Sequence, residues 1–511
     1  MNKCASGKGR LILLTNSMRV FNGIAMAAVL MTLLPGVVRA EAKPMFDRQD
    51  CWFDVPEDEP AECGYLVVPE NRRQPGGSTV RLPIVILKAD PDEDTHTDPI
   101  LYITGGPGSD TEIDRRGMAT WLRIRRSEWL EGRDFILFDQ RGVGMAKPAL
   151  ECPEVNRVGM QILTLTGKPE EQRDVYVQSL NDCAARLRDE GRDFANYTTR
   201  ATVADIADMR TALGIKEWNL LGGSYGSRVA LAVMRYRPEG VRSVILDSVF
   251  PPQVKFYEAE PAKIAWSIDK VAKACAADRD CNQRMPNAKQ KLLEIMDRLQ
   301  AKPVMVKQKD PTTGKMIELP VNGAVWLRFM MELMAERDAE LQLVRYVALF
   351  DRGNYNFLSD YVRLTTLAYT RDRSTKYGMH YSVNCNDEYP FTDWQAVQSA
   401  LAASPVIAEY AAALDTMEAC PAWMSPDAER LEKTPVQSNI PSLILNGEFD
   451  PKTPPEWAES TARNLPHSFY FEVKRVGHGA IFESACVVRM VKEFLDDPLT
   501  RPADACVAQE D

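Results

Sequence analysis

Short apolar segments recur along this chain, and each of them stops at glycine or at a polar turn. Residues 100–104 (ILYIT) run into the sequence GGPG, and residues 135–138 (FILF) run into DQRG. Continuous apolar runs of this length are typical of parallel strands that are buried on both faces. Helical patterns separate several of the runs, and this alternation predicts an α/β protein with a doubly wound, mainly parallel sheet.

The predicted strands and helices fall into two blocks. We predict strands at residues 64–69, 80–88, 100–104, 135–138, 218–221, 241–246, 442–445 and 469–473. We predict helices at residues 171–190, 200–213, 226–236, 455–463 and 482–495. In the second of these helices, Thr202 and Asp205 resemble a capping box, and Gly214 is a stop signal.

The alternation of strands and helices stops after Pro251-Pro252 and resumes near residue 442. Residues 253–435 are rich in Ala, Met, Leu and charged side chains, and their character is mostly helical. A chain of 511 residues exceeds the usual size of a single hydrophobic core, which leaves two domains or one domain with a large insertion. We predict one α/β core, formed by residues 41–252 and 436–511, that is interrupted by a helical cap at 253–435.

The composition narrows the classes of protein to consider. With 45% hydrophobic and 26% charged residues, the chain is typical of a globular protein and not of a disordered, collagen-like or multi-span membrane chain. Its net charge of −10 and the lack of a long basic block argue against a nucleic-acid partner. Only four histidines are present, so a histidine-rich metal site is not expected, and we predict neither a metal nor a cofactor.

The N-terminus resembles a secretory signal peptide. Residues 1–40 carry five basic residues and no acid, residues 24–34 form an apolar run, and residues 38–40 (VRA) fit a cleavage site. Cleavage after Ala42 is the alternative, and translation could start at Met18, because the segment from there is a complete signal by itself. An uncleaved anchor is the rival interpretation, but this apolar run is well short of the ~20 residues that a membrane span needs. We therefore predict an exported protein, periplasmic or secreted, without a membrane anchor; losing five positive charges takes its net charge from −10 to −15.

Ten cysteines remain after the predicted signal, which contains Cys4. An even number of cysteines in an exported chain favours disulfides. Pairing between sequence neighbours is the simplest of many connectivities: 51–63, 152–183, 275–281, 385–420 and 486–506. Zinc is the rival interpretation, but the sequence has no CxxC pair and no cluster of cysteine and histidine.

The segment 222–226 (GGSYG) has the pattern G-x-S-x-G and stands between a predicted strand and a predicted helix. That is the context of a nucleophilic serine on a sharp turn, where the small residues let the helix approach the strand. Ser224 is therefore the candidate nucleophile, and it needs a base and an acid that orients the base.

The candidate base and acid follow from the order of the chain, because in this type of fold the acid and then the histidine come after the serine. His478 follows the strand 469–473 and is our candidate base. The other histidines lie before that strand (His467), in an acidic loop (His96) and in the insertion (His380). Asp450 follows the strand 442–445 and is our candidate acid, with Glu448 as the competitor.

Two backbone groups are candidates for stabilising the oxyanion of a tetrahedral intermediate. One is the N–H of Tyr225, directly after the candidate nucleophile. The other is the N–H of Gly106 in the GGPG loop, because the next residue, Pro107, has no N–H to donate.

These motifs together resemble the prolyl and tripeptidyl aminopeptidase group of α/β-hydrolases. The matching segments are CGYLVVPE at 63–70, GGPG at 105–108, DQRGVG at 139–144, GGSYGS at 222–227, NGEFDPKTP at 446–454 and VGHG at 476–479. CNDE at 385–388 and the Cys486–Cys506 tail are similar to the secreted tripeptidyl branch. The prolyl branch usually has histidine and tryptophan where this chain has Thr104 and Tyr225, which weakens an expectation of strict proline specificity.

The resemblance implies a serine exopeptidase that removes residues or short peptides from a free N-terminus, with Ser224, Asp450 and His478 as its triad. Such an enzyme must recognise an α-ammonium group, so Asp387 and Glu388 in the cap are candidates to bind it; the alternative is that they are solvated surface acids. An esterase or another acyl hydrolase with the same triad is the alternative function. A binding protein without catalytic activity is the third possibility, and the complete triad argues against it.

Overall fold

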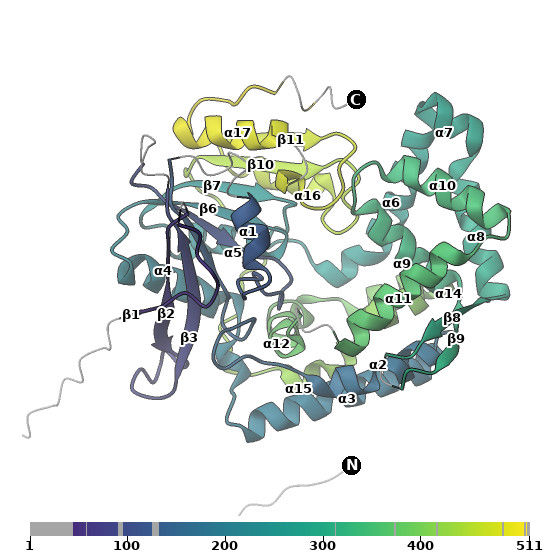
Figure 1. The fold of residues 1–511 in the computed structure, drawn as a ribbon, viewed down its shortest axis with the longest axis horizontal. Helices are drawn as coiled ribbons and strands as arrows, with labels where there is room; N and C mark the ends of the chain where they lie inside the picture. Colours follow the sequence, from purple (N-terminus) through teal and green to yellow (C-terminus); the bar gives the residue numbers. More distant parts are fainter. Residues whose placement is uncertain are drawn as a thin grey trace, which may run out of the picture. The chain divides into compact units, whose positions relative to one another are not determined.

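A nine-stranded sheet forms the centre of the structure, which is a computed structural model (Figure 1). The structure describes residues 44–507 apart from 58, 90–95, 125–131, 312, 372–374, 415–416, 483–484 and 505–506. The predicted signal peptide, residues 1–40, lies outside the described residues. Among the helices that the structure describes, none is long and apolar enough to cross a bilayer.

The strands of the sheet stand in the order β1-β2-β3-β5-β4-β6-β7-β10-β11. Their bounds are Met45–Gln49 (β1), Ala61–Pro69 (β2), Thr79–Leu87 (β3), Ile100–Ile103 (β4), Phe135–Phe138 (β5), Trp218–Gly223 (β6), Val241–Asp247 (β7), Ser442–Gly447 (β10) and Ser468–Val473 (β11). The first three pairs in this order, β1-β2, β2-β3 and β3-β5, are antiparallel. All pairs from β5-β4 to β10-β11 are parallel. The predicted mainly parallel sheet is confirmed. Strand β1 was not predicted, because a short polar edge strand has no apolar run and depends on its pairing with β2.

Helices cover both faces of the sheet, and neighbouring residues of a strand therefore enter different hydrophobic clusters. On β6, for example, Leu220 packs in the cluster of helices α4 (Thr199–Ala212) and α5 (Tyr225–Tyr236), whereas Leu221 packs on the opposite side against α17 (Ala485–Asp496). Helices α1 (Met118–Ile124) and α16 (Pro455–Ala462) complete this part of the fold. Such two-sided burial explains why the strands appear in the sequence as continuous apolar runs.

Helix α4 corrects one detail of the sequence prediction. The hydroxyl of Thr198 accepts a hydrogen bond from the N–H of Ala201, so Thr198 is the N-cap and the predicted capping box of Thr202 and Asp205 is wrong. Both residues are buried inside the helix, where the Asp205 carboxylate pairs with a buried arginine. The predicted stop, Gly214, has a φ of +69° just after the helix.

The segment predicted to be a helical cap is mostly helical. It contains α6 (Phe256–Ala277), α7 (Arg279–Arg284), α8 (Ala288–Ala301), α9 (Gly323–Met334), α10 (Ala339–Asp351), α11 (Asn356–Arg371), α12 (Tyr377–Asp387), α13 (Trp394–Ala402), α14 (Pro405–Leu414) and α15 (Cys420–Trp423). It also contains an antiparallel hairpin of β8 (Val304–Lys309) and β9 (Met316–Val321), which the sequence analysis did not find.

The cap has a hydrophobic cluster of its own, but it does not include all cap helices. Residues of α6–α11, of α14 and of the β8–β9 hairpin form this cluster together with Phe449 after β10, whereas Met379 and Tyr381 of α12 pack into the main cluster beside the sheet. Helices α2 (Pro153–Thr164) and α3 (Pro169–Asp189), which precede the insertion, contact α11 and α14 of the cap (Figure 1). The domain boundaries at residues 252 and 435 therefore stay a prediction.

Four of the five predicted disulfides are present: Cys51–Cys63, Cys152–Cys183, Cys275–Cys281 and Cys385–Cys420. Each closes a short loop, which typically stabilises a fold by about 2–4 kcal/mol. The fifth predicted pair, Cys486–Cys506, includes a residue that lies outside the described residues. The prediction of disulfides in place of zinc is confirmed for these eight cysteines.

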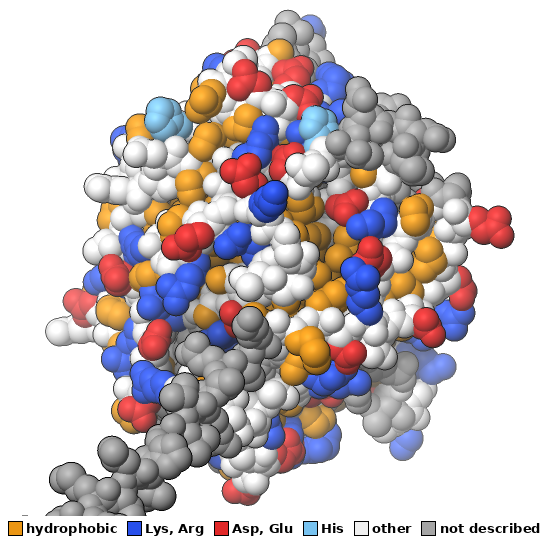
Figure 2. All heavy atoms as spheres, turned by 90° about the vertical axis from the view of Figure 1, so that its left-hand side faces the viewer, with side chains coloured by type: hydrophobic (Ala, Val, Ile, Leu, Met, Phe, Trp, Pro, Cys, Tyr) orange, Lys and Arg blue, Asp and Glu red, His pale blue; other side chains and the backbone are white. Residues whose placement is uncertain are grey.

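The charged side chains do not gather by sign on the face that carries β1, β2 and β3. Figure 2 shows lysine and arginine interspersed with aspartate and glutamate over the described part of this face.

Helix α5 packs very closely on the sheet. Neither Gly222 at the end of β6 nor Gly226 at the start of α5 has room for a side chain. A Cβ at Gly226 would lie 1.9 Å from the carbonyl oxygen of Ile103, and a Cβ at Gly222 would lie 2.4 Å from the carbonyl oxygen of Gly226. At Gly223, in contrast, a Cβ would meet nothing within 4 Å.

We predict that Gly226→Ala lowers the free energy of unfolding by about 2–3 kcal/mol, because α5 must move away from β4 to accommodate the methyl group. Gly223→Ala is the matched control and should change the stability by much less. Chemical denaturation of both variants measures the difference. Equal stabilities of the two variants would contradict this account of the packing.

Candidate active site

Ser224 stands on a strained turn between β6 and α5. Its backbone has a φ of 55° and a ψ of −124°, a conformation that costs a residue other than glycine of order 1–3 kcal/mol. The N–H of Ser224 donates to the carbonyl oxygen of Asp247 at the end of the neighbouring strand β7, at 2.9 Å. The surrounding structure thus holds a conformation that exposes the hydroxyl at the carboxyl edge of the sheet, as the G-x-S-x-G pattern predicts.

Asp450 and His478 lie on two loops at the same edge of the sheet. Asp450 follows β10 and His478 follows β11, and these strands are parallel neighbours. The Nδ1 atom of His478 is 2.9 Å from both carboxylate oxygens of Asp450. Because an ionised carboxylate only accepts hydrogen bonds, Nδ1 carries the proton and Nε2 is left as the basic atom of the neutral ring.

The Asp450 carboxylate is completely buried, and several donors stabilise its charge. The N–H groups of Lys452 and Thr453 donate to its Oδ1 atom, and the Thr453 hydroxyl donates to its Oδ2 atom. Burial by itself raises the pKa of Asp450, but His478 and the donors of Thr453 outweigh burial and hold the pKa below its usual value. The acid therefore remains ionised at neutral pH in spite of its dry surroundings.

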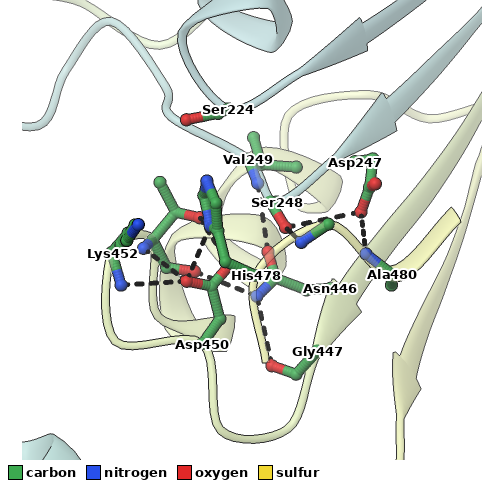
Figure 3. Close-up of polar contacts among 12 residues, drawn as sticks. Ser224, Asp247, Ser248, Val249, Asn446, Gly447, Asp450, Lys452, His478 and Ala480 are labelled. Carbon is green, nitrogen blue, oxygen red and sulfur yellow. Dashed lines mark hydrogen bonds and ion pairs between the residues drawn. The ribbon is translucent and has the colours of Figure 1, made fainter. Parts of the chain in front are cut away.

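The imidazole of His478 lies between Asp450 and Ser224 (Figure 3). Its edge with Nδ1 faces the carboxylate, and the hydroxyl of Ser224 lies on the other side of the ring. Within the described part of the chain, no hydrogen bond joins Ser224 to His478. Hydrogen bonds of this kind are often loose in enzymes without substrate and tighten in the complex.

The GGPG loop packs directly against Ser224. A Cβ at Gly105 would lie 3.0 Å from the Cβ of Ser224, so this position requires glycine for the close approach. Gly106, with a φ of +111°, lines the same cavity as Ser224. Among the described residues, the N–H groups of Gly106 and Tyr225 have no hydrogen-bond partner, which leaves both available for a developing oxyanion.

A cavity of about 840 Å³ opens beside Ser224 and extends under the cap. Its wall near the sheet includes Ser224, Gly106, Pro107 and Pro451–Thr453. The rest of the wall is mixed: it includes aromatic side chains (Phe250, Phe256, Tyr257, Tyr389, Trp394 and Tyr410) and charged ones (Glu170, Arg173, Glu260, Lys263, Glu332, Glu409 and Glu418). A cavity that combines apolar walls with polar groups is typical of a binding site for a small molecule or a peptide.

Asp387 and Glu388, the candidates for amine binding, do not line this cavity. Both are buried, so the alternative that they are solvated surface acids is wrong. The Asp387 carboxylate accepts hydrogen bonds from Thr199 and from the N–H of Leu431. Glu388 pairs with Arg228 and Lys433, and this arrangement connects the cap to α5. These contacts give both acids a structural partner inside the protein.

Two large buried side chains, Arg141 in the DQRG segment and Trp423 near Cys420, have structural positions. Arg141 is completely buried, forms a bidentate ion pair with Asp205 and donates to the carbonyl oxygens of Glu70 and Asn196, so it braces the fold away from the cavity. Trp423 is completely buried and belongs to the core.

The competing acid and two of the competing histidines lie away from the proposed triad. Glu448 forms ion pairs with Lys270 and Lys474 and has no contact with His478. His96 and His467 are exposed.

Sequence reasoning missed three residues near Ser224. Glu260 of α6 and His380 of α12 line the cavity, and Asp247 lies between the loops of Ser224 and His478. Glu260 and His380 are in the cap, where no strand pattern indicates which residues face the sheet. Asp247 did have a signal, because it ends a predicted parallel strand in the same way as Asp450 follows one.

Two segments of the chain match known protein families. Residues 98–300 match the family described as alpha/beta hydrolase fold, and residues 404–506 match the family described as TAP-like protein. The first segment contains Ser224, and the second contains Asp450 and His478.

Several curated proteins are similar to this chain. The tripeptidyl aminopeptidase of Streptomyces lividans is 28% identical over 221 residues, which cover 41% of this chain and 39% of that protein. The serine protease Hip1 of Mycobacterium tuberculosis (strain ATCC 25618 / H37Rv) is 23% identical over 481 residues, 87% of each chain. A proline iminopeptidase of Xylella fastidiosa (strain 9a5c) is 27% identical over 195 residues, 38% of this chain and 42% of that protein. The chain thus spans about two fifths of the tripeptidyl aminopeptidase that it matches.

Among solved structures, the proline iminopeptidase of Mycobacterium smegmatis is similar, with 12% identity and a TM-score of 0.36 over 85% of this chain and 98% of that chain. The order of the sheet and the family match at residues 98–300 show that the chain has the α/β-hydrolase fold. It is similar to proteins named tripeptidyl aminopeptidase, serine protease and proline iminopeptidase, which confirms the predicted resemblance.

The lowered pKa of Asp450 predicts how this residue contributes to stability at different pH values. A carboxyl whose pKa is lower in the folded than in the unfolded protein stabilises the fold above its unfolded value, near 3.8, and this contribution is lost as the pH falls through the folded value. We expect Asp450→Asn to lower the melting temperature at neutral pH, and the difference from the wild type to shrink below about pH 4. Calorimetry between about pH 3 and pH 7 tests this, and a difference that stays constant would contradict it.

Proposed function

We propose that this protein is an exported serine exopeptidase that releases single residues or short peptides from the free N-terminus of peptides. The observation that carries the proposal is the arrangement of the Asp450–His478 pair beside Ser224, which lines a cavity that also has walls from the cap. A covered cavity suits short chain ends better than the middle of a folded polypeptide. The names of the similar proteins support a peptidase.

In the proposed mechanism, the Ser224 hydroxyl attacks the carbonyl carbon of the scissile bond while Nε2 of His478 takes its proton. The imidazolium is stabilised by Asp450, and the N–H groups of Gly106 and Tyr225 bind the oxyanion. The imidazolium then protonates the leaving amine, and an acyl-enzyme on Ser224 remains. Water, deprotonated by His478, hydrolyses this ester and restores the serine.

Recognition of the free N-terminus requires a negative charge in the cavity. Glu260 of α6 is our candidate, in place of Asp387 and Glu388. The side chain of Glu260 lines the cavity and is 12% exposed. Its Oε2 atom forms an ion pair with Lys263 Nζ at 2.6 Å. Because a carboxylate has two acceptor oxygens, the other oxygen of Glu260 can accept from the ammonium group of a substrate. Glu409 also lines the cavity, but both of its oxygens already accept hydrogen bonds within the protein.

Export is part of the proposal. The four disulfides are the observation that supports it, since such bonds persist in oxidising compartments. Residues 1–40 would then act as the signal peptide that their sequence resembles.

We expect Ser224→Ala to abolish hydrolysis of peptide chromogens and labelling by a fluorophosphonate probe, because the hydroxyl forms the acyl-enzyme. Losses of 10³-fold or more in kcat, on the order of those seen for other triads, are expected with an unchanged melting temperature. Turnover close to that of the wild type in this variant would contradict the proposed mechanism.

We further expect acetylation of the substrate's N-terminus to reduce kcat/KM strongly, and Glu260→Gln to raise the KM of free peptides by about tenfold, as the loss of one charged contact would. Hydrolysis of p-nitrophenyl esters, which have no ammonium group, should change little in Glu260→Gln. Glu418→Gln is the matched control, because Glu418 also lines the cavity but its side chain is 53% exposed. If acetylated and free peptides are cleaved equally well, the exopeptidase proposal fails, and efficient hydrolysis of esters alone would favour an esterase.

A further inference from the structure

Asp247 occupies a central position among the strands that carry the proposed triad. It is the last residue of β7, which lies between β6 and β10 in the sheet. In the register of these strands it stands beside Gly223, next to the proposed nucleophile, and beside Leu445 on the strand that leads to Asp450. Its side chain is 1% exposed and has no role in the mechanism proposed above.

Asp247 contacts both the nucleophile turn and the histidine loop, and Figure 3 shows its hydrogen bond to Ala480 in the histidine loop. Its carbonyl oxygen accepts the hydrogen bond from the N–H of Ser224. Its carboxylate accepts hydrogen bonds from the N–H groups of Ala480 at 3.0 Å and Ile481 at 3.1 Å, two and three residues after His478. The hydroxyl of the next residue, Ser248, accepts from the N–H of Gly479 at 2.8 Å.

These bonds fix the histidine loop immediately after the proposed base. The three consecutive N–H groups of residues 479–481 all point to β7 and its end, and none of these bonds comes from the loop of Asp450. The pair of Asp450 and His478 orients the ring, whereas the bonds to Asp247 and Ser248 set the position of the backbone that carries the ring relative to Ser224.

The cost of this arrangement argues that it serves a purpose. In the described part of the chain, Asp247 forms no ion pair with lysine or arginine, and a buried carboxylate without such a partner is expensive. The net result is a pKa raised to about 6: burial and the charge of Asp450 raise it, and they outweigh the backbone N–H groups of Ile481 and Ala480 and the positive form of His478, which lower it. An asparagine of the same size would remove the buried charge but could offer only one acceptor oxygen to the two N–H groups.

We propose that Asp247 is a positioning residue of the active site, whose carboxylate and carbonyl group hold the loop of His478 and the turn of Ser224 at a fixed separation. This inference rests on the proposed triad. In this proposal the end of β7, which lies between the strand of the nucleophile and the strand of the acid, positions the residues of the triad. Displacement of a catalytic group by about 1 Å can lower a rate by about 100-fold, so a small shift of this loop has a large effect.

The test compares Asp247→Asn with Asp98→Asn in the full chain. Asp98 lies just before β4, at the opposite edge of the sheet, and its carboxylate accepts from Arg133 and Asn219, so this control removes a partly buried acid remote from Ser224. For each variant we would measure the melting temperature, the kcat and KM for a p-nitrophenyl ester, and the rate of labelling by a fluorophosphonate. Ester and probe require the triad but not the recognition of a peptide N-terminus.

We expect Asp247→Asn to lower kcat and the labelling rate by about 10–100-fold with KM changed by less than about twofold. Asp98→Asn should keep the wild-type kcat even where it lowers the melting temperature. A second variant, Ser248→Ala, removes the hydroxyl that accepts from the Gly479 N–H and keeps the Asp247 carboxylate, so it should lower kcat by a smaller factor. If Asp247→Asn does not fold, the kcat of Ser248→Ala tests whether these bonds position the loop of His478.

Two results would overturn the inference: wild-type kcat in the variants of Asp247 and Ser248, or an equal loss of kcat in Asp98→Asn. Failure of the proposed function is a separate result, because it would appear as retained labelling and turnover in Ser224→Ala.

Discussion

The close packing of helix α5 on strands β4 and β6 is the constraint that shapes the candidate site. Gly222 and Gly226 have no space for a side chain, so the chain turns sharply between strand and helix and forces Ser224 into a backbone conformation that serine seldom adopts. The hydroxyl consequently stands at the N-terminus of α5, at the carboxyl edge of the sheet. The next residue, Tyr225, presents its N–H on the same side because it begins the helix.

The remaining parts of the site gather at this edge because parallel strands end there. The loops after β4, β6, β10 and β11 contribute the glycine loop, the serine, Asp450 and His478, and the last residue of β7 is Asp247. The charges of Asp247 and Asp450 are stabilised mostly by N–H and hydroxyl groups. Asp450 is ionised in a dry environment because three donors and an imidazole surround it, and fixed donors of this kind do not have to reorganise during a reaction.

The cap contacts the catalytic loops directly. The N–H of His478 donates to the carbonyl oxygen of Ala335 in the cap, and Gly477 approaches Ala335 so closely that a Cβ would lie 2.2 Å from its carbonyl carbon. On the other side of the cavity, His380 of α12 contacts the carbonyl oxygen of Pro107 through Nδ1, 3.0 Å away. The cap therefore lines the cavity and also supports the loops of the proposed base and of the proposed oxyanion site.

The sequence by itself determined the sheet, the turn of Ser224 and the positions of Asp450 and His478, because buried strands, glycines without space for a side chain and the ends of parallel strands all leave local patterns. It also indicated the four disulfides that lie among the described residues, since these join cysteines that are neighbours in sequence. The edge strand β1 and the hairpin of β8 and β9 have only weak local patterns and depend on their pairing.

Only the tertiary structure decided which acids face the cavity. Asp387 and Glu388 belong to a motif in the sequence, yet α12 directs them toward Thr199, Arg228 and Lys433, while Glu260 reaches the cavity from α6. The reason is physical: the direction of a side chain on a cap helix depends on how the helices pack on one another and on the sheet, and residues far apart in sequence set that packing.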